Sequence, residues 1–443
     1  MFGSLVAIGI TAQVAIQVII NIAVVTSSMP ATGMPLPFFS YRRYSFIYFI
    51  VWDGGIIKYI KSKQFLGRRK KMMKVIIAAA GTAGHINPGI AIANKIKKED
   101  KDSNIIFIGT TRGLENDLVP RAGYELKTIE AYGLSKKLTI DNIKKMYKTW
   151  KGLGEAKKII KEFKPDIVIG TGGYICGATI TAAHRLKIST ILHESNSFPG
   201  RAVKMLAKKT DTILVSFEDT VKRIKNAKNI VCTGTPVKIK KREYSINEKT
   251  KILQDLGLKA TKPVIIISGG SQGAQKINEA IFEIIKNKRN KNYQMIWATG
   301  PKQYDDIKEK LENENILITN LENTKIVPYI YNMEEVMNVA DVAIGRAGAM
   351  TVTEISNLGK PSILIPLPNV SHNHQFYNAK VLENVGAAKI ILNNEVTGEI
   401  LNQAIEEIVL DKNKMKKMGE NAFKVSTQQA EDAIYEEIKK LLK

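Results

Sequence analysis

The chain is poor in the residues on which several classes of protein depend. Two cysteines in 443 residues, Cys176 and Cys232, are too few for a disulfide-stapled secreted protein and fit a reduced compartment, with a pairing of the two left open. Acidic residues number 42 against 66 Lys and Arg, a formal charge of +24. Nucleic acid would suit that charge, but no nucleic-acid motif accompanies it, so we expect no such partner. A basic surface that meets anionic lipid headgroups fits at least as well.

Charged residues are absent from positions 1–41. Residues 4–25 are long and apolar enough to cross a bilayer, with Gln13, Gln17 and Asn21 as the main polar interruptions. A signal peptide would need a basic start and a shorter apolar core, and both are missing. We therefore expect an N-terminal transmembrane segment.

From about residue 73 the sequence alternates as an α/β protein does. Two series of short apolar runs, separated by amphipathic stretches, predict two parallel sheets. About 370 residues exceed one typical core, so we expect two domains, joined by the basic residues 238–258. The predicted strands are residues 74–80, 104–109, 166–170, 189–193 and 212–216, then 263–268, 294–298, 316–320, 341–345 and 362–366.

Glycine-rich or polar turns follow several strands of the first series, at residues 80–88, 170–174 and 193–196. Parallel sheets bind ligands beyond the carboxyl ends of their strands, so two such domains facing each other would form a cleft lined by these turns. An imidazole on such a turn can accept a proton near neutral pH, which makes His85 the candidate base. A histidine that only bonds its own turn is the alternative.

The second series has corresponding turns. Residues 268–274 follow a strand and precede a helix, so Ser271 and nearby N–H groups suit a phosphate oxygen. Residues 340–354 predict a strand, a glycine turn and a helix whose free N–H groups suit a diphosphate. Glu354, about one turn further, suits the vicinal hydroxyls of a ribose. Glycines that only close a βα turn are the alternative.

These turns give residues 73–443 a resemblance to the MurG family of peptidoglycan glycosyltransferases. The segments that carry it, in the family's order, are Gly-Thr-Ala-Gly-His-Ile-Asn-Pro, Thr-Gly-Gly-Tyr, His-Glu-Ser-Asn, Gly-Gly-Ser-Gln-Gly-Ala, Arg-Ala-Gly-Ala-Met-Thr-Val-Thr-Glu and His-Gln-Phe-Tyr-Asn-Ala. The resemblance implies a GT-B fold, with two Rossmann-like domains facing a cleft. It also implies transfer of N-acetylglucosamine from UDP-GlcNAc to lipid I, the undecaprenyl-diphosphate-linked muramyl pentapeptide, to give lipid II.

The resemblance also implies roles for single residues. Ile330 would offer backbone to uracil, Glu354 would hold the ribose and Ser271 the diphosphate. For the reaction itself we expect an inverting single displacement with His85 as the base. Where the family usually has Arg this chain has Lys238, which keeps the charge without a bidentate fork. The expected substrate-binding positions are Thr82, Ala83, Gly84, Asn196, Lys238, Ser271, Gln272, Ile330, Met350, Thr351, Glu354 and Gln375.

We expect no metal and no cofactor. His372 and His374 lie before the helix that Gln375 opens, but no cysteine or carboxylate cluster accompanies them. The cleft turns also lack the Asp-x-Asp pair of metal-binding glycosyltransferases. A UDP-GlcNAc 2-epimerase of the same fold and a membrane scaffold that only binds nucleotide sugar are the other functions considered; the epimerase would need acidic cleft residues.

The expected organisation places the enzyme at the cytoplasmic side of the cell membrane. Its partners would be UDP-GlcNAc, lipid I, the anionic membrane surface, and proteins of cell division and peptidoglycan synthesis. Residues 134–150 mix apolar residues with lysines and would contact that surface or pack on their own sheet. The expected parts are a membrane segment at 1–71, an acceptor domain at 73–237, a UDP-GlcNAc domain at 238–424, and a C-terminal helix at 425–443 that packs back on the acceptor domain.

Residues 1–41 resemble a second family, the C-terminal end of FtsW-type lipid II polymerases. The matching segment, Pro-Leu-Pro-Phe-Phe-Ser-Tyr, ends at Tyr41. That family continues with two glycines, whereas Arg42 and Arg43 follow here, so we expect the likeness to end there. Residues 42–71 would then be either a basic linker in a true fusion or the product of a frameshift between neighbouring genes.

Overall fold

The computed structural model describes residues 2–30, 72–133, 139–270 and 273–442. The chain divides into two compact units, Met1–Met72 and Met73–Lys443. In the first unit, α1 (Phe2–Val25) is the expected helix, and Asn21 Nδ2 donates to the carbonyl of Gln17 at 2.7 Å. Within the described ranges, no helix is long and apolar enough to cross a membrane. The helix expected at residues 4–25 is confirmed, and the membrane span is not.

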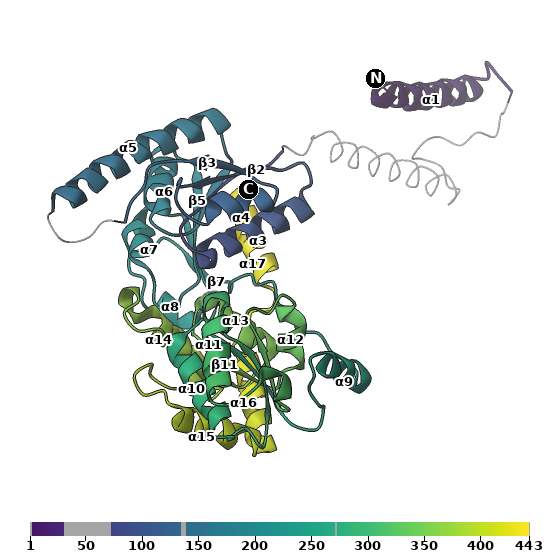
Figure 1. Cartoon of the computed structure of the whole chain (residues 1–443). Coiled ribbons are helices and arrows are strands. Elements are labelled where there is room, and N and C mark those ends of the chain that lie inside the picture. The colour runs from purple at the N-terminus through teal and green to yellow at the C-terminus, as the bar shows by residue number, and fades with distance from the viewer. Residues whose placement is uncertain (1, 31–71, 134–138, 271–272, 443) are drawn as a thin grey trace. The chain divides into compact units, whose positions relative to one another are not determined.

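The second unit contains two parallel sheets, which confirms the predicted pair of Rossmann-like domains in a GT-B fold (Figure 1). The first sheet has the order β3-β2-β1-β4-β5-β6-β7, and the second β10-β9-β8-β11-β12-β13. The strands of the first are β1 (Lys74–Ala79), β2 (Asn104–Gly109), β3 (Glu125–Thr128), β4 (Ile167–Gly172), β5 (Ser189–Glu194), β6 (Thr212–Val215) and β7 (Ile230–Cys232). Those of the second are β8 (Val264–Ser268), β9 (Gln294–Ala298), β10 (Thr324–Val327), β11 (Val342–Gly345), β12 (Ser362–Leu364) and β13 (Ala388–Ile390).

One predicted strand is wrong, and four observed strands, β3, β7, β10 and β13, were not predicted. Residues 316–320 were expected to be a strand, but Ile318–Asn320 is a short 3-10 helix and the strand follows at β10. Ile318 packs against the core from this 3-10 helix, so the apolar run shows that the segment is partly buried but does not distinguish a strand from a helix. These four strands are short and are the edge strands of the two sheets, where less of each strand is buried and the apolar signal is weak.

Helices cover both faces of each sheet, and each face has its own apolar core. The central strand β1 is buried from Val75 to Ala79, as a parallel strand covered on both sides must be. The helices of the first domain are α3 (Ala83–Glu99), α4 (Glu115–Arg121), α5 (Ile140–Phe163), α6 (Ile175–Arg185), α7 (Arg201–Leu206) and α8 (Glu218–Val221). Those after it are α9 (Ile246–Asp255), α10 (Gln275–Lys286), α11 (Pro301–Asn313), α12 (Met333–Val339), α13 (Ala349–Leu358), α14 (His374–Asn384), α15 (Gly398–Val409), α16 (Lys412–Lys424) and α17 (Ala430–Leu442).

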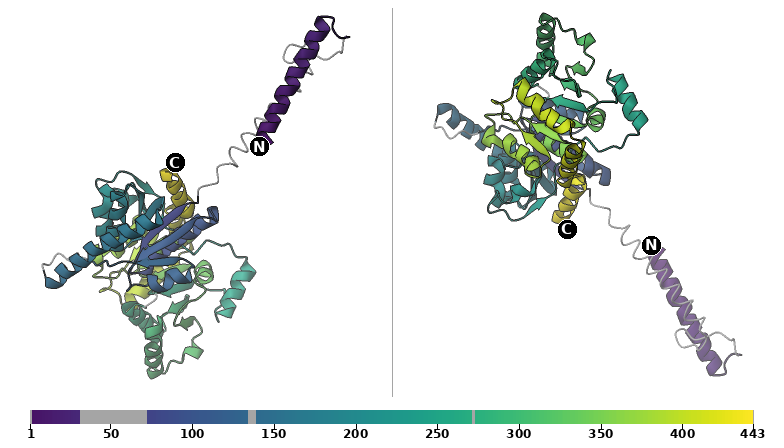
Figure 2. Two further views of the ribbon diagram at one scale, coloured as in Figure 1. Left: turned by 90° about the horizontal axis from the view of Figure 1, so that it is seen from above. Right: turned by 90° about the horizontal axis from the view of Figure 1, so that it is seen from below.

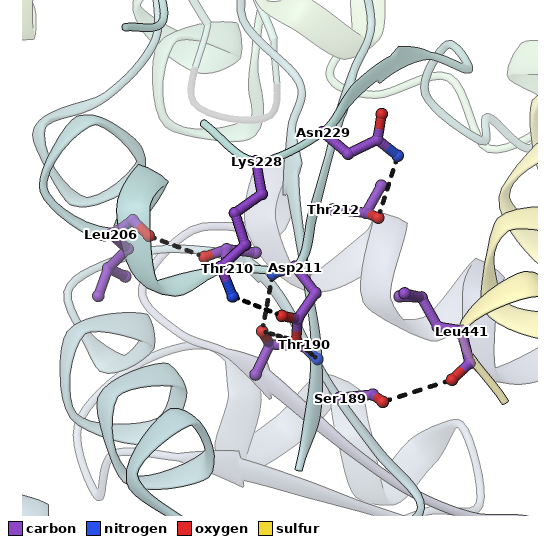
Figure 3. Close-up of polar contacts among 9 residues, drawn as sticks. All are labelled: Ser189, Thr190, Leu206, Thr210, Asp211, Thr212, Lys228, Asn229 and Leu441. Carbon is purple, nitrogen blue, oxygen red and sulfur yellow. Dashed lines mark hydrogen bonds and ion pairs between the residues drawn. The ribbon is translucent and has the colours of Figure 1, made fainter. Parts of the chain in front are cut away.

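The chain crosses between the two domains twice. The expected connection at residues 238–258 contains α9, whose Leu253 is buried in the second domain's core. At the C-terminus, α17 lies beside α3 of the first domain (Figures 1 and 2). Its Ile434 and Ile438 are buried there, and Ser189 Oγ donates to the carbonyl of Leu441 at 3.4 Å (Figure 3). This return fixes the end of the chain to the domain in which the second unit begins.

Candidate active site

The turn after β1 holds His85 in a defined position. Thr82 is the N-cap of α3, although its exposed hydroxyl makes no cap, and Ala83 and Gly84 form the first turn. The His85 Nδ1 atom lies 3.2 Å from the carbonyl oxygen of Ala80. A carbonyl only accepts, so Nδ1 carries the hydrogen and Nε2 keeps a lone pair. The histidine bonds its own turn, and the same bond leaves Nε2 able to accept a proton.

The second glycine turn is shaped to the His85 ring. A Cβ atom on Gly172, which has φ of +134°, would lie 2.3 Å from His85 Cδ2. From the same strand end, the Thr171 hydroxyl donates to the carbonyl of His85 at 2.8 Å. Two of the turns predicted to share one sheet edge therefore meet at this imidazole.

A cavity of about 690 Å³ opens beside His85. Its walls come from α5, α6 and α7 and from the turns between strands and helices, and they are largely apolar, with Trp150, Leu153 and Leu206 among them. His372 and His374 reach it from the second domain. Among the described residues no group of three or more His, Cys, Asp or Glu side chains could hold a metal ion. His372 instead stacks on Phe198 at 5.6 Å and accepts a bond from Arg201 Nε at 3.3 Å.

The third turn lines the same cavity and also joins the two domains. Glu194 accepts the backbone N–H of Asn196 at 2.9 Å and that of Gly200 at 2.7 Å, which folds the loop. Asn196 Oδ1 accepts from Asn378 Nδ2 at 3.1 Å, across the domain boundary. His193 is buried against the carbonyl of Gly234 at 3.0 Å, and burial lowers its pKa to about 4. Asn196 and His193 thus have structural partners that the sequence did not indicate.

The second domain carries an isolated carboxylate at the expected place. Glu354 lies in α13, which begins after Gly348, so the N–H groups of Ala349 and Met350 have no helical carbonyl to bond. Met350 and Thr351 are half-buried in this first turn. Burial raises the pKa of Glu354 to about 7, and no described residue donates a hydrogen bond to its side chain. A partnerless carboxylate in such a place is suited to a ligand that brings its own donors.

Two other predicted positions, Ile330 and Gln375, lie in the second domain with Glu354. The Ile330 side chain is buried in the core, and its backbone N–H and C=O have no partner among the described residues, so they can pair with a nucleobase edge. Gln375 Oε1 accepts the N–H of Leu367 at 2.9 Å, which leaves its Nε2 for a ligand. Lys238 is exposed and does not line the cavity beside His85. Ser271 and Gln272 lie outside the described residues.

Three supporting residues were missed by the sequence analysis. Arg346 is half-buried and donates to Asn393 Oδ1 at 2.8 Å and to the carbonyl of Ile365 at 3.1 Å; burial lowers its pKa. Asn378 lies between the domains, and Glu115 lies under the turn at His85. All three act on segments far away in the sequence, so no local spacing could have revealed them.

Comparison with known proteins identifies the family. Models of the Glycosyltransferase family 28 N-terminal and C-terminal domains match residues 75–215 and 264–436. The UDP-N-acetylglucosamine--N-acetylmuramyl-(pentapeptide) pyrophosphoryl-undecaprenol N-acetylglucosamine transferase of Thermoanaerobacter sp. is 46% identical over 369 residues, 83% of this chain and 100% of that protein. The chain belongs to this transferase family. The crystal structure of Acinetobacter baumannii MurG matches with a TM-score of 0.67 at 26% identity, over 83% of this chain and 99% of that one.

The MurG resemblance of the second unit is thus confirmed. The relative of the same transferase name from Acetivibrio thermocellus is 44% identical, over 84% of this chain and 99% of that protein. A third family model, Cell cycle protein, matches residues 1–64, which confirms the FtsW-like start. It also corrects the expectation that the likeness ends at Tyr41, because the match continues through the arginines that follow. The frameshift between neighbouring genes stays a prediction. Sequencing the N-terminus of the protein that the natural gene produces would test it.

Proposed function

We propose that this chain transfers N-acetylglucosamine from UDP-GlcNAc to the muramyl C4 hydroxyl of lipid I, forming lipid II for peptidoglycan synthesis. Membership of the MurG family supports the reaction class. The proposal assigns the nucleotide sugar to the second domain and the lipid-linked acceptor to the first. A cleft between two sheets then brings the reacting atoms of two large substrates together.

The isolated carboxylate of Glu354 is the observation that carries the donor assignment. Ionising it without a partner costs free energy, as its raised pKa shows. Two ribose hydroxyls would each donate a hydrogen bond to it and remove that cost. The free N–H groups at the start of α13 lie about one turn away, where a diphosphate would be held. Ile330, Met350, Thr351 and Gln375 complete the proposed donor site, with Ser271 and Gln272 on the diphosphate.

In the proposed mechanism His85 Nε2 takes the proton of the C4 hydroxyl. The hydroxyl oxygen attacks the anomeric carbon of the donor from the side opposite UDP and inverts its configuration. As the new C–O bond forms, the bond to the diphosphate breaks and UDP departs with the negative charge. N–H groups of the α3 start, at Ala83 and Gly84, and of the α13 start would stabilise that charge. Thr82, Asn196 and Lys238 are kept as substrate-binding positions.

The proposed location is the cytoplasmic face of the cell membrane. The N-terminal half of α5 supports a contact with the bilayer, since Met146, Tyr147 and Trp150 are 52%, 66% and 71% exposed. The C-terminal half packs on the first domain through Ala156 and Ile160, while the other half projects beyond it (Figures 1 and 2). Aromatic residues beside lysines suit the interface where the lipid acceptor lies. Proteins of cell division and peptidoglycan synthesis remain proposed partners.

A transfer assay tests the proposal. The full-length chain is given UDP-GlcNAc labelled in the sugar and a lipid I analogue, and label in the lipid product is measured. We expect label to move to the lipid with release of UDP. An epimerase would instead change the labelled sugar without any acceptor, and a scaffold would bind UDP-GlcNAc without turnover. Either of those results would overturn the proposed reaction.

A further inference from the structure

One peptide unit in the turn after β1 connects His85 to a buried carboxylate. The carbonyl of Ala80 bonds His85 Nδ1, at 3.2 Å. The N–H of the same peptide, which belongs to Gly81, donates to Glu115 Oε2 at 2.9 Å. A trans peptide points its C=O and N–H to opposite sides, so His85 and Glu115 face the two edges of one plane. Because the peptide is planar, a partner that fixes the direction of its N–H also fixes the direction of its C=O.

Glu115 is held as a charged group. Its side chain is 0% exposed, and Oε1 accepts the N–H of Thr110 at 2.9 Å and the Thr110 hydroxyl at 2.7 Å. Burial opposes ionisation, but the hydrogen bonds from Gly81 and Thr110 outweigh it and lower the pKa of Glu115. Gly113 leaves room for the carboxylate, since a Cβ there would lie 1.9 Å from Oε2. The chain thus builds a fixed negative charge directly under the turn.

The turn needs such an anchor because of Gly81. This residue has φ of +96°, and a Cβ placed on it would meet nothing within 4 Å. Glycine adopts both signs of φ readily, so the peptide before it can rotate at little cost. Rotation would turn the Ala80 carbonyl away from His85 Nδ1. A carboxylate that binds the N–H of this peptide prevents the rotation.

We propose that Glu115 is a positioning residue for His85 and acts through the peptide between Ala80 and Gly81. It keeps the Ala80 carbonyl in place as an acceptor, so that the imidazole carries its hydrogen on Nδ1 and its lone pair on Nε2. In catalytic triads a carboxylate does this by bonding the imidazole directly; here a peptide lies between them. The inference rests on the proposed function, in which His85 accepts the proton of the acceptor hydroxyl.

The first test is Glu115→Gln in the full-length chain, with kcat and the donor KM measured in the transfer assay. A glutamine keeps the shape, but its amide NH₂ cannot accept a hydrogen bond and must face the N–H of either Gly81 or Thr110. When it faces Gly81, the peptide between Ala80 and Gly81 loses its anchor. We expect kcat to fall on the order of ten- to a hundredfold, which is the usual loss when a metal-ligating side chain loses the residue that orients it. The donor KM should change by less than about twofold, because the donor binds mainly in the other domain.

A double-mutant cycle separates positioning from a general loss of structure. In a His85→Ala background, Glu115→Gln should lower kcat no further, because a residue that acts through His85 has nothing left to position. If Glu115→Gln lowers kcat by the same factor in the wild-type chain and in His85→Ala, the proposal is overturned.

Asp211 offers a matched control in the same sheet. It lies directly before β6, at the amino ends of the strands, whereas the turn at His85 follows the carboxyl end of β1. Its carboxylate accepts the N–H and the hydroxyl of Thr190, both at 2.9 Å, and pairs with Lys228 at 2.8 Å (Figure 3). Asp211→Asn therefore removes a similarly bonded carboxylate without touching the turn at His85. Its kcat should stay within about twofold of the wild-type value. Equal losses of kcat in the two variants would show that Glu115 acts on stability alone.

A second measurement does not depend on whether Glu115→Gln folds. Long-range proton–nitrogen spectra of the full-length chain, isotope-labelled in its histidines, report the tautomer of each ring. The signals of His85 are those lost in His85→Ala. Wild type should show hydrogen on Nδ1, and Glu115→Gln should show a mixture of tautomers. Hydrogen on Nε2 in the wild type would overturn the proposal. Failure of the proposed function looks different, because the wild-type chain would then transfer no label.

Discussion

Asn378 in the second domain and Asn196 in the first are joined by a hydrogen bond of 3.1 Å between Nδ2 and Oδ1. Asn378 is fully buried, and it also accepts the N–H of Ser197 at 2.8 Å and donates to the carbonyl of Ala347 at 3.2 Å. One amide therefore connects the loop after β5 to the turn before α13. That turn begins the helix of Glu354, so the two halves of the site share a buried polar link.

Asn378→Asp should loosen this link. A carboxylate accepts from Ser197 but cannot donate to Asn196 or Ala347, so two buried acceptors face a negative charge. We expect the free energy of unfolding to fall by roughly 1–3 kcal/mol per group left unpaired, and kcat to fall with it. Urea unfolding and X-ray scattering of the variant measure stability and domain separation.

Asn278→Asp is the control for that experiment. Asn278 is also buried, and it bonds Trp297 and the carbonyl of Thr299 within the second domain. This variant should lose stability without a change in domain separation. If the two variants scatter alike, Asn378 does not hold the domains together.

His85→Ala should abolish most of the turnover while the chain still binds UDP. Removing a general base costs on the order of 10²–10⁴ in rate. The nucleoside contacts proposed for UDP lie in the second domain, so its dissociation constant should be unchanged. The exposed His184 on α6, changed to Ala, provides a control histidine substitution that should leave kcat unaltered. Normal turnover in His85→Ala would remove this residue from the mechanism.

Donor binding should strengthen as pH rises through neutrality. The Glu354 pKa of about 7 lies above its ordinary value because the carboxyl is buried, and only the ionised form accepts two ribose hydroxyls. Binding of UDP should therefore be about tenfold tighter at pH 8 than at pH 6, by calorimetry. Glu354→Gln should bind more weakly and without this pH dependence. An unchanged dissociation constant in Glu354→Gln would refute the ribose assignment.

The same carboxyl gives a stability test with the opposite sign. Its folded-state pKa is raised, so between its ordinary value and about pH 7 the folded chain without donor keeps a proton that the unfolded chain has lost, and stability falls as pH rises through this range. Glu354→Gln should be more stable than wild type at pH 8 and nearly equal to it at pH 4, where the carboxyl is protonated in both states. Chemical unfolding at both values checks this, and a variant that is less stable at pH 8 would contradict it.

Lysines on the projecting half of α5 should bind anionic vesicles. Changing Lys144, Lys145 and Lys148 to Gln removes about 1 kcal/mol each at an anionic surface, so binding should weaken roughly a hundredfold at low salt. Lys157 and Lys158, exposed on the packed half of α5, are the matched control pair. Vesicle sedimentation measures both variants. Equal binding by wild type and the triple variant would show that α5 is not the contact.

The sequence alone determined the two parallel sheets, the glycine turns at their carboxyl ends and the family, because these depend on local apolar runs and short segments. It named His85 and Glu354 for the same reason, since each lies a fixed number of residues from a strand end. Short edge strands such as β3 and β13 escaped, because little of their surface is buried. Only the tertiary structure decided which groups hold these side chains: Glu115 lies 34 residues from Gly81, and Asn378 lies 182 from Asn196. Such pairs are formed by packing, which no periodicity in the chain records.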